Sequence, residues 1–429
     1  MTTNVLQLTR KEEVKQQLRK LLETYYALEE EVFVPGQSSV KLSTTVYDAQ
    51  EAKGMMESFL SGWITQGQVV KSFEEKYAEW VGRRYAVAVN SGSSANLIAL
   101  NLLMEEGKLK RGDEVVVPAA TFATAVAPVL QLGLTPVYVD VRAQTLNIDP
   151  EEVARSIGRR TKLLLTVHTL GYPADMTKLL KLAKEADLLV MEDCCESHGA
   201  SCQGRPVGSM GILGTFSFFV AHNMTTGEGG MIVTDTPSHA SLARSLREFG
   251  RIPQGKERYY SDDRLTDYDC RQVFERCGYN MRMTDLTAAC GIAQLEKVEA
   301  MNEKRREAAR YYCEHLRPFE ALVQLPVEEP GNRHVYYGFS LVIQKGSPFS
   351  RTDLVRFLDE HKIESRPLFG GCLPDQPGFR KAPGRIVGKL PVSRWLRDNA
   401  LFIGVHPKIG EAERSYVVET LSQFLKKYR

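Results

Sequence analysis

The chain has 429 residues, of which 43% are hydrophobic and 25% charged, and its formal net charge at pH 7 is +2. This composition is typical of a soluble globular protein with one large domain and a smaller one, and its interleaved basic and acidic residues argue against a nucleic-acid-binding surface. No apolar run is long enough to span a membrane, and residues 1–20 are polar and charged, unlike a signal peptide. We therefore expect a cytoplasmic protein that binds neither nucleic acid nor membrane.

The predicted elements begin with helices and then alternate between strands and helices. Residues 8–31 have helical apolar spacing, residues 34–45 resemble an extended arm, and a second helix is expected near 49–61. Seven strand-like runs follow, over residues 85–89, 114–117, 136–139, 163–167, 188–192, 214–219 and 231–234. This alternation predicts an α/β fold with a mainly parallel seven-stranded sheet, whose ligands bind at the carboxyl ends of the strands.

The last third of the chain predicts a smaller α/β part. A long charged helix is expected over residues 294–317, strands near 337–343, and a terminal helix over 411–428. The predicted organisation is an N-terminal helical arm (1–40), a large domain (41–292) and a small C-terminal domain (293–429).

A serine- and glycine-rich turn follows the first predicted strand. The run Asn90-Ser91-Gly92-Ser93-Ser94-Ala95 opens the apolar helix ANLIALNLLM, so hydroxyls and free backbone amides gather at a helix N-terminus. Such a place can bind a phosphate. In isolation the same run is also an ordinary capping turn.

The loop TFSFFVAHNMTTGEGG, residues 215–230, contains the most informative residue of the chain, His222. A lone histidine after an apolar run is more often structural than catalytic, and TTGEGG alone is an ordinary glycine-rich turn. The surrounding motifs reverse that interpretation, because they fall in the order of a known family.

From about residue 42 to the end, the chain resembles the DegT/DnrJ/EryC1/StrS sugar aminotransferases, which have the fold-type I architecture of pyridoxal phosphate (PLP) enzymes. The motifs that carry the resemblance are NSGSSA, PAATFAT, VHTLGYPADM, EDCCESHGA, FSFF followed by TTGEGG, and GYNMRMTDLTAACGIAQL. His222 stands where the family has its cofactor-binding lysine. Because an imidazole can move protons but cannot bind PLP covalently, we predict PLP or pyridoxamine phosphate (PMP) bound non-covalently, with His222 as the catalytic residue.

The resemblance also implies the other cofactor contacts. The phosphate is expected at Gly92, Ser93, Ser94 and Ser217, and the ring against Phe122. Asp193 is the candidate for the pyridine nitrogen, since a carboxylate there keeps that nitrogen protonated. In the family, the asparagine that matches Asn280 reaches the phosphate of the neighbouring subunit, which implies a homodimer with shared active sites.

A histidine at this position resembles the 3-dehydrase and 3-dehydratase branch of the family. The resemblance implies removal of the C-3 hydroxyl from a nucleotide-linked 4-keto-6-deoxy sugar, with L-glutamate as the amino donor that restores PMP. Two alternatives stay open: a nucleotide-sugar aminotransferase that uses His222 as its proton shuttle, and a [2Fe-2S]-dependent 3-dehydrase.

The cysteines weigh against the iron–sulfur alternative. Iron–sulfur members of the branch carry a C-x-C pair in the loop after a Gly-Arg dipeptide, and the loop after Gly250-Arg251 lacks one. Cys195 matches the first cluster cysteine, but only Cys270 and Cys277 lie in that loop. We therefore expect neither a cluster nor any other metal site, and we expect most of the cysteines to be reduced and buried.

Some further residues are weaker candidates. His168 and His198 are expected near the cofactor ring, where they could support the site. Four basic residues could contact the nucleotide or the sugar, although solvent-exposed surface is the plainer interpretation for each: Arg251, Lys256, Arg282 and Arg366.

Overall fold

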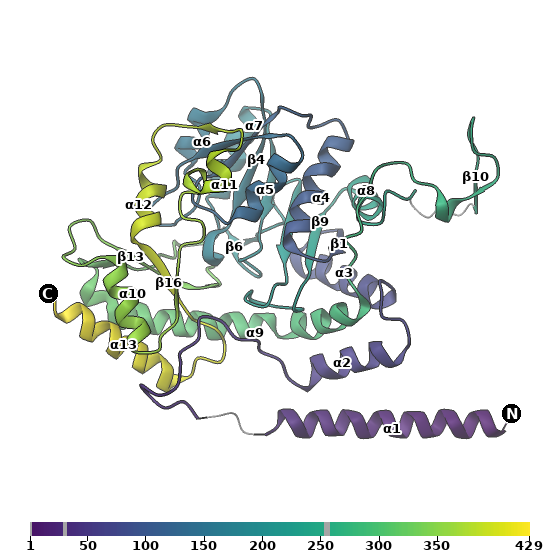
Figure 1. The fold of residues 1–429 in the computed structure, drawn as a ribbon, viewed down its shortest axis with the longest axis horizontal. Helices are drawn as coiled ribbons and strands as arrows, with labels where there is room; N and C mark the ends of the chain where they lie inside the picture. Colours follow the sequence, from purple (N-terminus) through teal and green to yellow (C-terminus); the bar gives the residue numbers. More distant parts are fainter. Residues whose placement is uncertain (1, 29–31, 253–257) are drawn as a thin grey trace.

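The structure is a computed structural model that describes residues 2–28, 32–252 and 258–429 (Figure 1). Three helices precede the sheet: α1 (Thr2–Tyr26), α2 (Ala49–Leu60) and α3 (Gln68–Val81). Helix α1 corresponds to the helix predicted over 8–31, of which residues 29–31 lie outside the described part. Helix α2 begins with a capping box: Asp48 accepts from the Gln50 amide at 2.7 Å, and its own amide donates to Glu51 at 2.9 Å.

The main sheet contains all seven predicted strands in the order β1-β9-β8-β5-β4-β2-β3, followed by an eighth, β15. Strand β9 is antiparallel to β1 and β8, and the other pairs are parallel. The strands are β1 (Tyr85–Val89), β2 (Glu114–Pro118), β3 (Thr135–Val139), β4 (Thr161–Val167), β5 (Leu189–Asp193), β8 (Leu213–Ser217), β9 (Gly230–Thr234) and β15 (Arg385–Ile386). The predicted fold class is confirmed, with an added edge strand from the C-terminal part of the chain.

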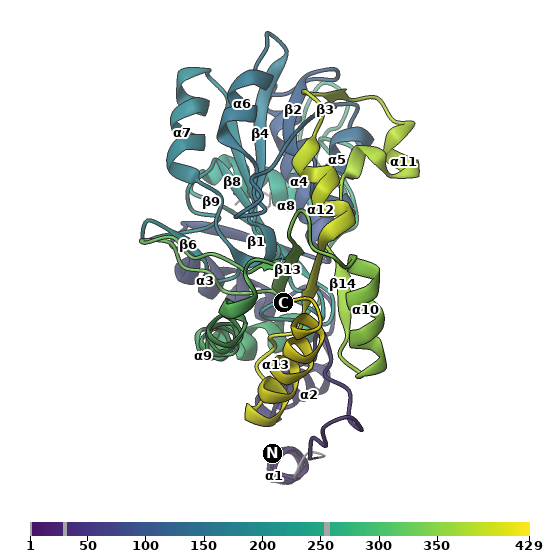
Figure 2. The same ribbon diagram turned by 90° about the vertical axis from the view of Figure 1, so that its left-hand side faces the viewer.

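Helices cover both faces of this sheet (Figure 2). Alternate residues of β2 face opposite sides: Val115 and Val117 pack with α4, α5 and α8, whereas Val116 packs with α6 and α7. Near β1, the second face is covered by α3 and α9 instead. The later helices are α4 (Gly92–Glu105), α5 (Ala123–Gln131), α6 (Pro150–Ser156), α7 (Met176–Glu185), α8 (Pro237–Arg247), α9 (Asp285–Leu316), α10 (Arg351–Glu360), α11 (Pro377–Arg380), α12 (Pro391–Asn399) and α13 (Glu411–Lys426).

A second, antiparallel sheet of four strands lies in the C-terminal part, in the order β12-β13-β16-β14. Its core includes side chains of α9, α10 and α13. Two-stranded ribbons complete the described elements. The bounds of these strands are β12 (Val323–Gln324), β13 (Phe339–Ile343), β14 (Ser365–Pro367), β16 (Ala400–Ile403), β6 (Ser201–Cys202), β7 (Arg205–Pro206), β10 (Tyr259–Tyr260) and β11 (Tyr268–Asp269).

Helix α9 begins at Asp285, nine residues before the predicted start at 294. Thr284 caps it by accepting from the Thr287 amide at 3.2 Å, and Asp285 accepts from the amides of Gly67 and Val70 at 2.8 and 3.0 Å. Because the predicted domain boundary at 292/293 falls inside this continuous helix, the helix runs through both parts, and the domain division stays a prediction.

Candidate active site

The carboxyl ends of β5 and β8 lie side by side and meet the start of α4. Asp193, the last residue of β5, is 4% exposed and accepts from the Asn96 side chain at 2.8 Å and from the Cys195 amide at 3.1 Å. The same Asn96 side chain accepts from Thr215 of β8 at 2.7 Å. Asn96 therefore ties the predicted phosphate turn to the predicted pyridine carboxylate, a role that the sequence analysis missed.

The turn before α4 is held tightly against β8 and β9. Ser91 caps α4, and Ser94 donates to the Asn90 side chain at 2.6 Å, while Ser93 is exposed at the helix N-terminus. A Cβ on Gly92 would lie 2.5 Å from the Cβ of Ser217. Three of the predicted phosphate residues, Gly92, Ser93 and Ser94, thus adjoin the fourth, Ser217.

Gly229 and Gly230 end the loop of His222, and the packing around Gly230 explains why a glycine stands there. A Cβ on Gly230 would come within 2.3 Å of the Ser91 carbonyl oxygen, so only glycine lets β9 start this close to the turn. Together, the backbone amides at the start of α4, the exposed hydroxyl of Ser93 and the glycine-lined contact with Ser217 form a place that fits a phosphate.

His222 lies in the loop between β8 and β9, partly exposed, with its Nδ1 atom buried and without a hydrogen-bond partner in the described structure. Its ring centroid lies 5.4 Å from that of Tyr337 and 6.3 Å from that of His198. Burial lowers the pKa of His222 to about 3, and the neighbouring His198 and Arg305 add to this effect. The imidazole is therefore neutral at pH 7 and able to accept a proton.

The two other predicted histidines have both ring nitrogens occupied. His198 donates to the Ser217 carbonyl at 2.8 Å and accepts from the Tyr77 hydroxyl at 2.9 Å. His168 donates to Glu192 at 3.2 Å and accepts from the Ala174 amide at 3.0 Å. Neither has a free atom for chemistry, so both support the fold around the site.

Phe122 and Asn280 both reach the surface. Phe122 caps α5, is 53% exposed and meets Phe369 edge to face, with the ring centroids 6.4 Å apart. Asn280 is exposed on the segment before α9 and accepts from Arg282 at 3.2 Å. The residue after it, Met281, accepts from the Asn90 amide at 3.0 Å, which places this segment beside the phosphate turn.

The predicted basic contacts separate into two groups. Arg251 and Arg282 both pair with Glu248, at 3.3 and 3.9 Å, and both lie over the Phe249 ring. Arg366 is exposed on β14 and donates to the carbonyl of Ser365. Lys256 lies outside the described residues.

Two places in the structure bear on metal binding: Cys195, and a buried group formed by His168, Glu192 and Cys194. Burial and the adjacent Asp193 raise the pKa of Cys195 well above its usual value, so without a metal its sulfur is a thiol. His168, Glu192 and Cys194 place potential ligand atoms within 4.8 Å of one another. However, Glu192 already accepts from His168 and from three backbone amides, which explains this group as a hydrogen-bond network.

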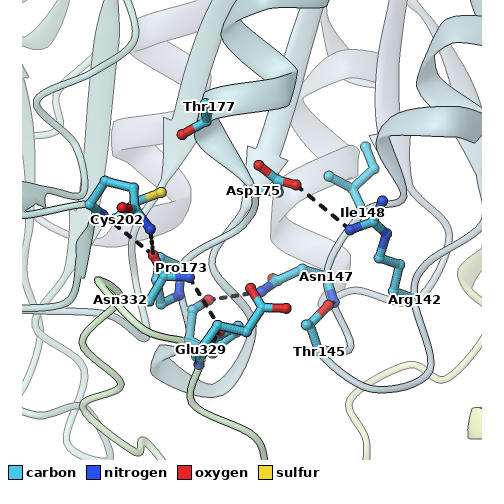
Figure 3. A pocket seen from close by; sticks show the side chains of 12 residues that line it. Arg142, Thr145, Asn147, Ile148, Pro173, Asp175, Thr177, Cys202, Glu329 and Asn332 are labelled. Carbon is cyan, nitrogen blue, oxygen red and sulfur yellow. Dashed lines mark hydrogen bonds and ion pairs between the residues drawn. The ribbon is translucent and has the colours of Figure 1, made fainter.

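A polar pocket of about 80 Å³ lies elsewhere in the molecule (Figure 3), and none of its lining residues is a predicted site residue. Arg142 lines it and pairs with Asp149 and Asp175, at 3.2 and 3.7 Å, so the charge of Arg142 is balanced locally.

In the described part of the chain, no helix is both long and apolar enough to cross a bilayer. The cytoplasmic location stays a prediction.

The large, mostly parallel sheet and its covering helices have the fold-type I architecture of PLP-dependent proteins. Residues 46–422 match the model of the DegT/DnrJ/EryC1/StrS aminotransferase family, and the chain belongs to this family. The predicted family is thus confirmed.

Individual relatives cover nearly the whole chain. The dTDP-4-dehydro-2,6-dideoxy-D-glucose 3-dehydratase of Saccharopolyspora spinosa is 35% identical over 413 residues, covering 93% of this chain and 89% of its own. The structure of E. coli GDP-4-keto-6-deoxy-D-mannose-3-dehydratase with bound hydrated PLP has a TM-score of 0.83 at 32% identity, covering 89% of this chain and 99% of its own. A structure of GDP-4-keto-6-deoxymannose-3-dehydratase with a trapped PLP-glutamate geminal diamine has a TM-score of 0.83 at 31% identity, covering 89% and 100%.

Proposed function

We propose that this protein is a PLP/PMP-dependent 3-dehydratase that removes the C-3 hydroxyl of a nucleotide-linked 4-keto-6-deoxy sugar. The observation that carries the proposal is His222, a neutral imidazole in the loop where the family has its lysine. The relatives support it, because both sugar enzymes are named as 3-dehydratases and one is solved with PLP and with a PLP-glutamate adduct.

The residues described above fit such a cofactor. The buried carboxylate of Asp193 would hold the pyridine nitrogen, Phe122 would cover the ring, and the phosphate would lie at the start of α4 beside Ser217. When bound, the cofactor supplies an amine that condenses with the 4-keto group and a ring that accepts electrons. Asn96 keeps Asp193 in place through its hydrogen bond.

His222 performs the proton transfers. Nδ1 is buried and without a partner in the described structure, so we assign the proton transfers to Nε2, which as a neutral nitrogen can accept a proton. The resulting imidazolium then delivers a proton to the C-3 hydroxyl as that group leaves. L-Glutamate returns the cofactor to its amine form.

The proposed cofactor chemistry can be followed by absorbance. We expect L-glutamate to convert the absorbance of bound PLP to that of PMP, and the loaded protein then to turn a dTDP- or GDP-linked 4-keto-6-deoxy sugar into a product that lacks one oxygen. Mass spectrometry of the product checks the result. A stable amino sugar would instead establish the aminotransferase alternative, and charge-transfer bands from iron and sulfur would establish the cluster-dependent one.

We further propose a homodimer with shared active sites. Helix α1 presents apolar residues at heptad-like spacing, Val14, Leu18, Leu21 and Tyr25, and all four side chains are exposed in the single chain. Asn280 is exposed close to the phosphate turn, where it can serve a neighbouring subunit. Apolar surface of this kind is typical of subunit interfaces.

If the active sites are shared between subunits, two inactive variants should restore activity when they form a mixed dimer. His222→Asn removes the proton carrier, and Asn280→Asp places a negative charge toward the phosphate. If each site combines His222 of one subunit with Asn280 of the other, a hybrid dimer keeps one intact site, and an equimolar refolded mixture should recover about a quarter of the wild-type activity. Sedimentation equilibrium checks the dimer, and zero recovery from a dimeric mixture would contradict shared sites.

A further inference from the structure

The middle of α9 carries two buried polar side chains one helical turn apart, Asn302 and Arg305, which are 0% and 3% exposed. Asn302 donates to the carbonyl of His198 at 2.8 Å and accepts from the side chain of Asn223 at 2.8 Å. Asn223 is the chain neighbour of His222. A single side chain of α9 therefore joins the turn after β5 to the loop after β8.

Arg305 joins a third segment to the same place. Its Nη1 donates to the carbonyls of Tyr336 and Tyr337, at 3.3 and 3.2 Å. Asn223 reaches this segment too, donating to the carbonyl of Val335 at 3.0 Å. In the described part of the chain Arg305 forms no ion pair with a carboxylate, and the hydrogen bonds of its guanidinium go to backbone carbonyls.

These contacts converge on the environment of His222. Its ring neighbours are His198, Phe219 and Tyr337, with centroids 6.3, 6.2 and 5.4 Å away. Asn302 holds the backbone of His198, Arg305 holds that of Tyr337, and the loop itself is held at Asn223. Displacing α9 side chains would therefore move two of the three rings that position the imidazole.

We propose that Asn302 and Arg305 are positioning residues that fix the ring of His222, an inference that rests on the proposed role of His222 as the acid and base. The groups that face His222 are the neutral ring of His198, the hydroxyl and ring of Tyr337 and the cation of Arg305. None of them is an anion, so the surroundings oppose a charged imidazole.

The test uses Asn302→Leu, which keeps the size of the side chain and removes both hydrogen bonds. We expect kcat for the PLP-to-PMP half-reaction with L-glutamate to fall about 100-fold, because a shift near 1 Å is enough for such a loss. KM for glutamate and the affinity for PLP should stay within about twofold of the wild type, since no cofactor contact changes. Lys304→Ala, an exposed neighbour on the same helix, is the matched control and should match the wild type.

A second readout does not depend on activity. The pKa of His222, measured by NMR titration of the cofactor-free protein, should rise in Arg305→Gln, which removes a nearby positive charge, and in Asn302→Leu, because a released loop lets the ring move toward solvent. Arg305→Lys keeps the charge and should keep the pKa close to its wild-type value. If Asn302→Leu does not fold, Asn302→Ser tests the same contacts with less loss of polarity.

An unchanged His222 titration together with unchanged kcat in folded variants would overturn the positioning role. A wild-type protein that fails to convert PLP with glutamate would instead count against the proposed function, and the NMR titration would still decide whether α9 controls the imidazole. The two failures are therefore distinguishable.

Discussion

Replacing His222 with asparagine is expected to lower the rate of PLP-to-PMP conversion by about 10³-fold, because positioned acid–base catalysis contributes about 10² to 10⁴. The amide is polar and similar in reach but cannot take up a proton near neutral pH. PLP affinity should change little, since the phosphate turn and Asp193 are untouched. Stopped-flow absorbance after mixing with L-glutamate measures the rate.

The matched control is His315→Asn, which changes an exposed histidine on α9 and should leave the rate unchanged. His222→Lys tests the same position by introducing the lysine that the family has there. A lysine there should bind PLP covalently and give the absorbance of a Schiff base. Full activity of His222→Asn would show that another group carries the protons.

Most of the fold could be predicted because the strands of the main sheet are short runs rich in β-branched residues between helix-length segments. Strand β15 could not, since a two-residue pairing such as Arg385–Ile386 leaves no periodic pattern. The start of α9 was missed for a different reason. Its first turns, DLTAACGIA, are small and mostly buried, so the charged periodicity that marks the rest of the helix is absent there.

The same contrast holds for the residues of the candidate site: some could be predicted from the sequence and others could not. Motif residues such as Asp193 and Ser217 could be placed because each ends a strand, and strand ends of a parallel sheet meet at one edge. Asn96, Asn302 and Arg305 carry no motif signal. They act on residues up to about a hundred positions away, as when Asn302 contacts His198, and only the packing of α4 and α9 brings these pairs together.

Acid should unfold the cofactor-free protein, because several buried histidines are neutral in the folded state. Burial lowers the pKa of His198 and His406 to about 4 and that of His334 to about 3, and all three are less than a tenth exposed. An unfolded histidine has a pKa near 6.5, so between these values the unfolded chain binds more protons. Stability is then full above about pH 7 and is lost as the pH falls toward 4.

One carboxyl group works against this trend. Burial raises the pKa of Glu196 to about 8, so its ionisation destabilises the folded state as the pH rises from 4.5 to 8, and acid relieves that cost. Each of the three histidines loses about 2 to 3 kcal/mol between pH 7 and 4.5, and Glu196 regains about 3 kcal/mol. The net loss of about 3 to 6 kcal/mol is comparable with the whole stability of many domains.

Urea unfolding of the cofactor-free protein at pH 7 and at pH 4.5 measures this difference in the free energy of unfolding. His198→Gln isolates one contribution, because the amide can still donate to Ser217 and accept from Tyr77 but does not titrate. The pH-dependent loss should shrink by about 2 kcal/mol in this variant and stay unchanged in His315→Gln, whose histidine is exposed. Equal losses in all three proteins would mean that His198 takes up a proton as readily in the folded state as in the unfolded state. That result would also contradict the inference that the surroundings of the adjacent His222 keep its imidazole neutral.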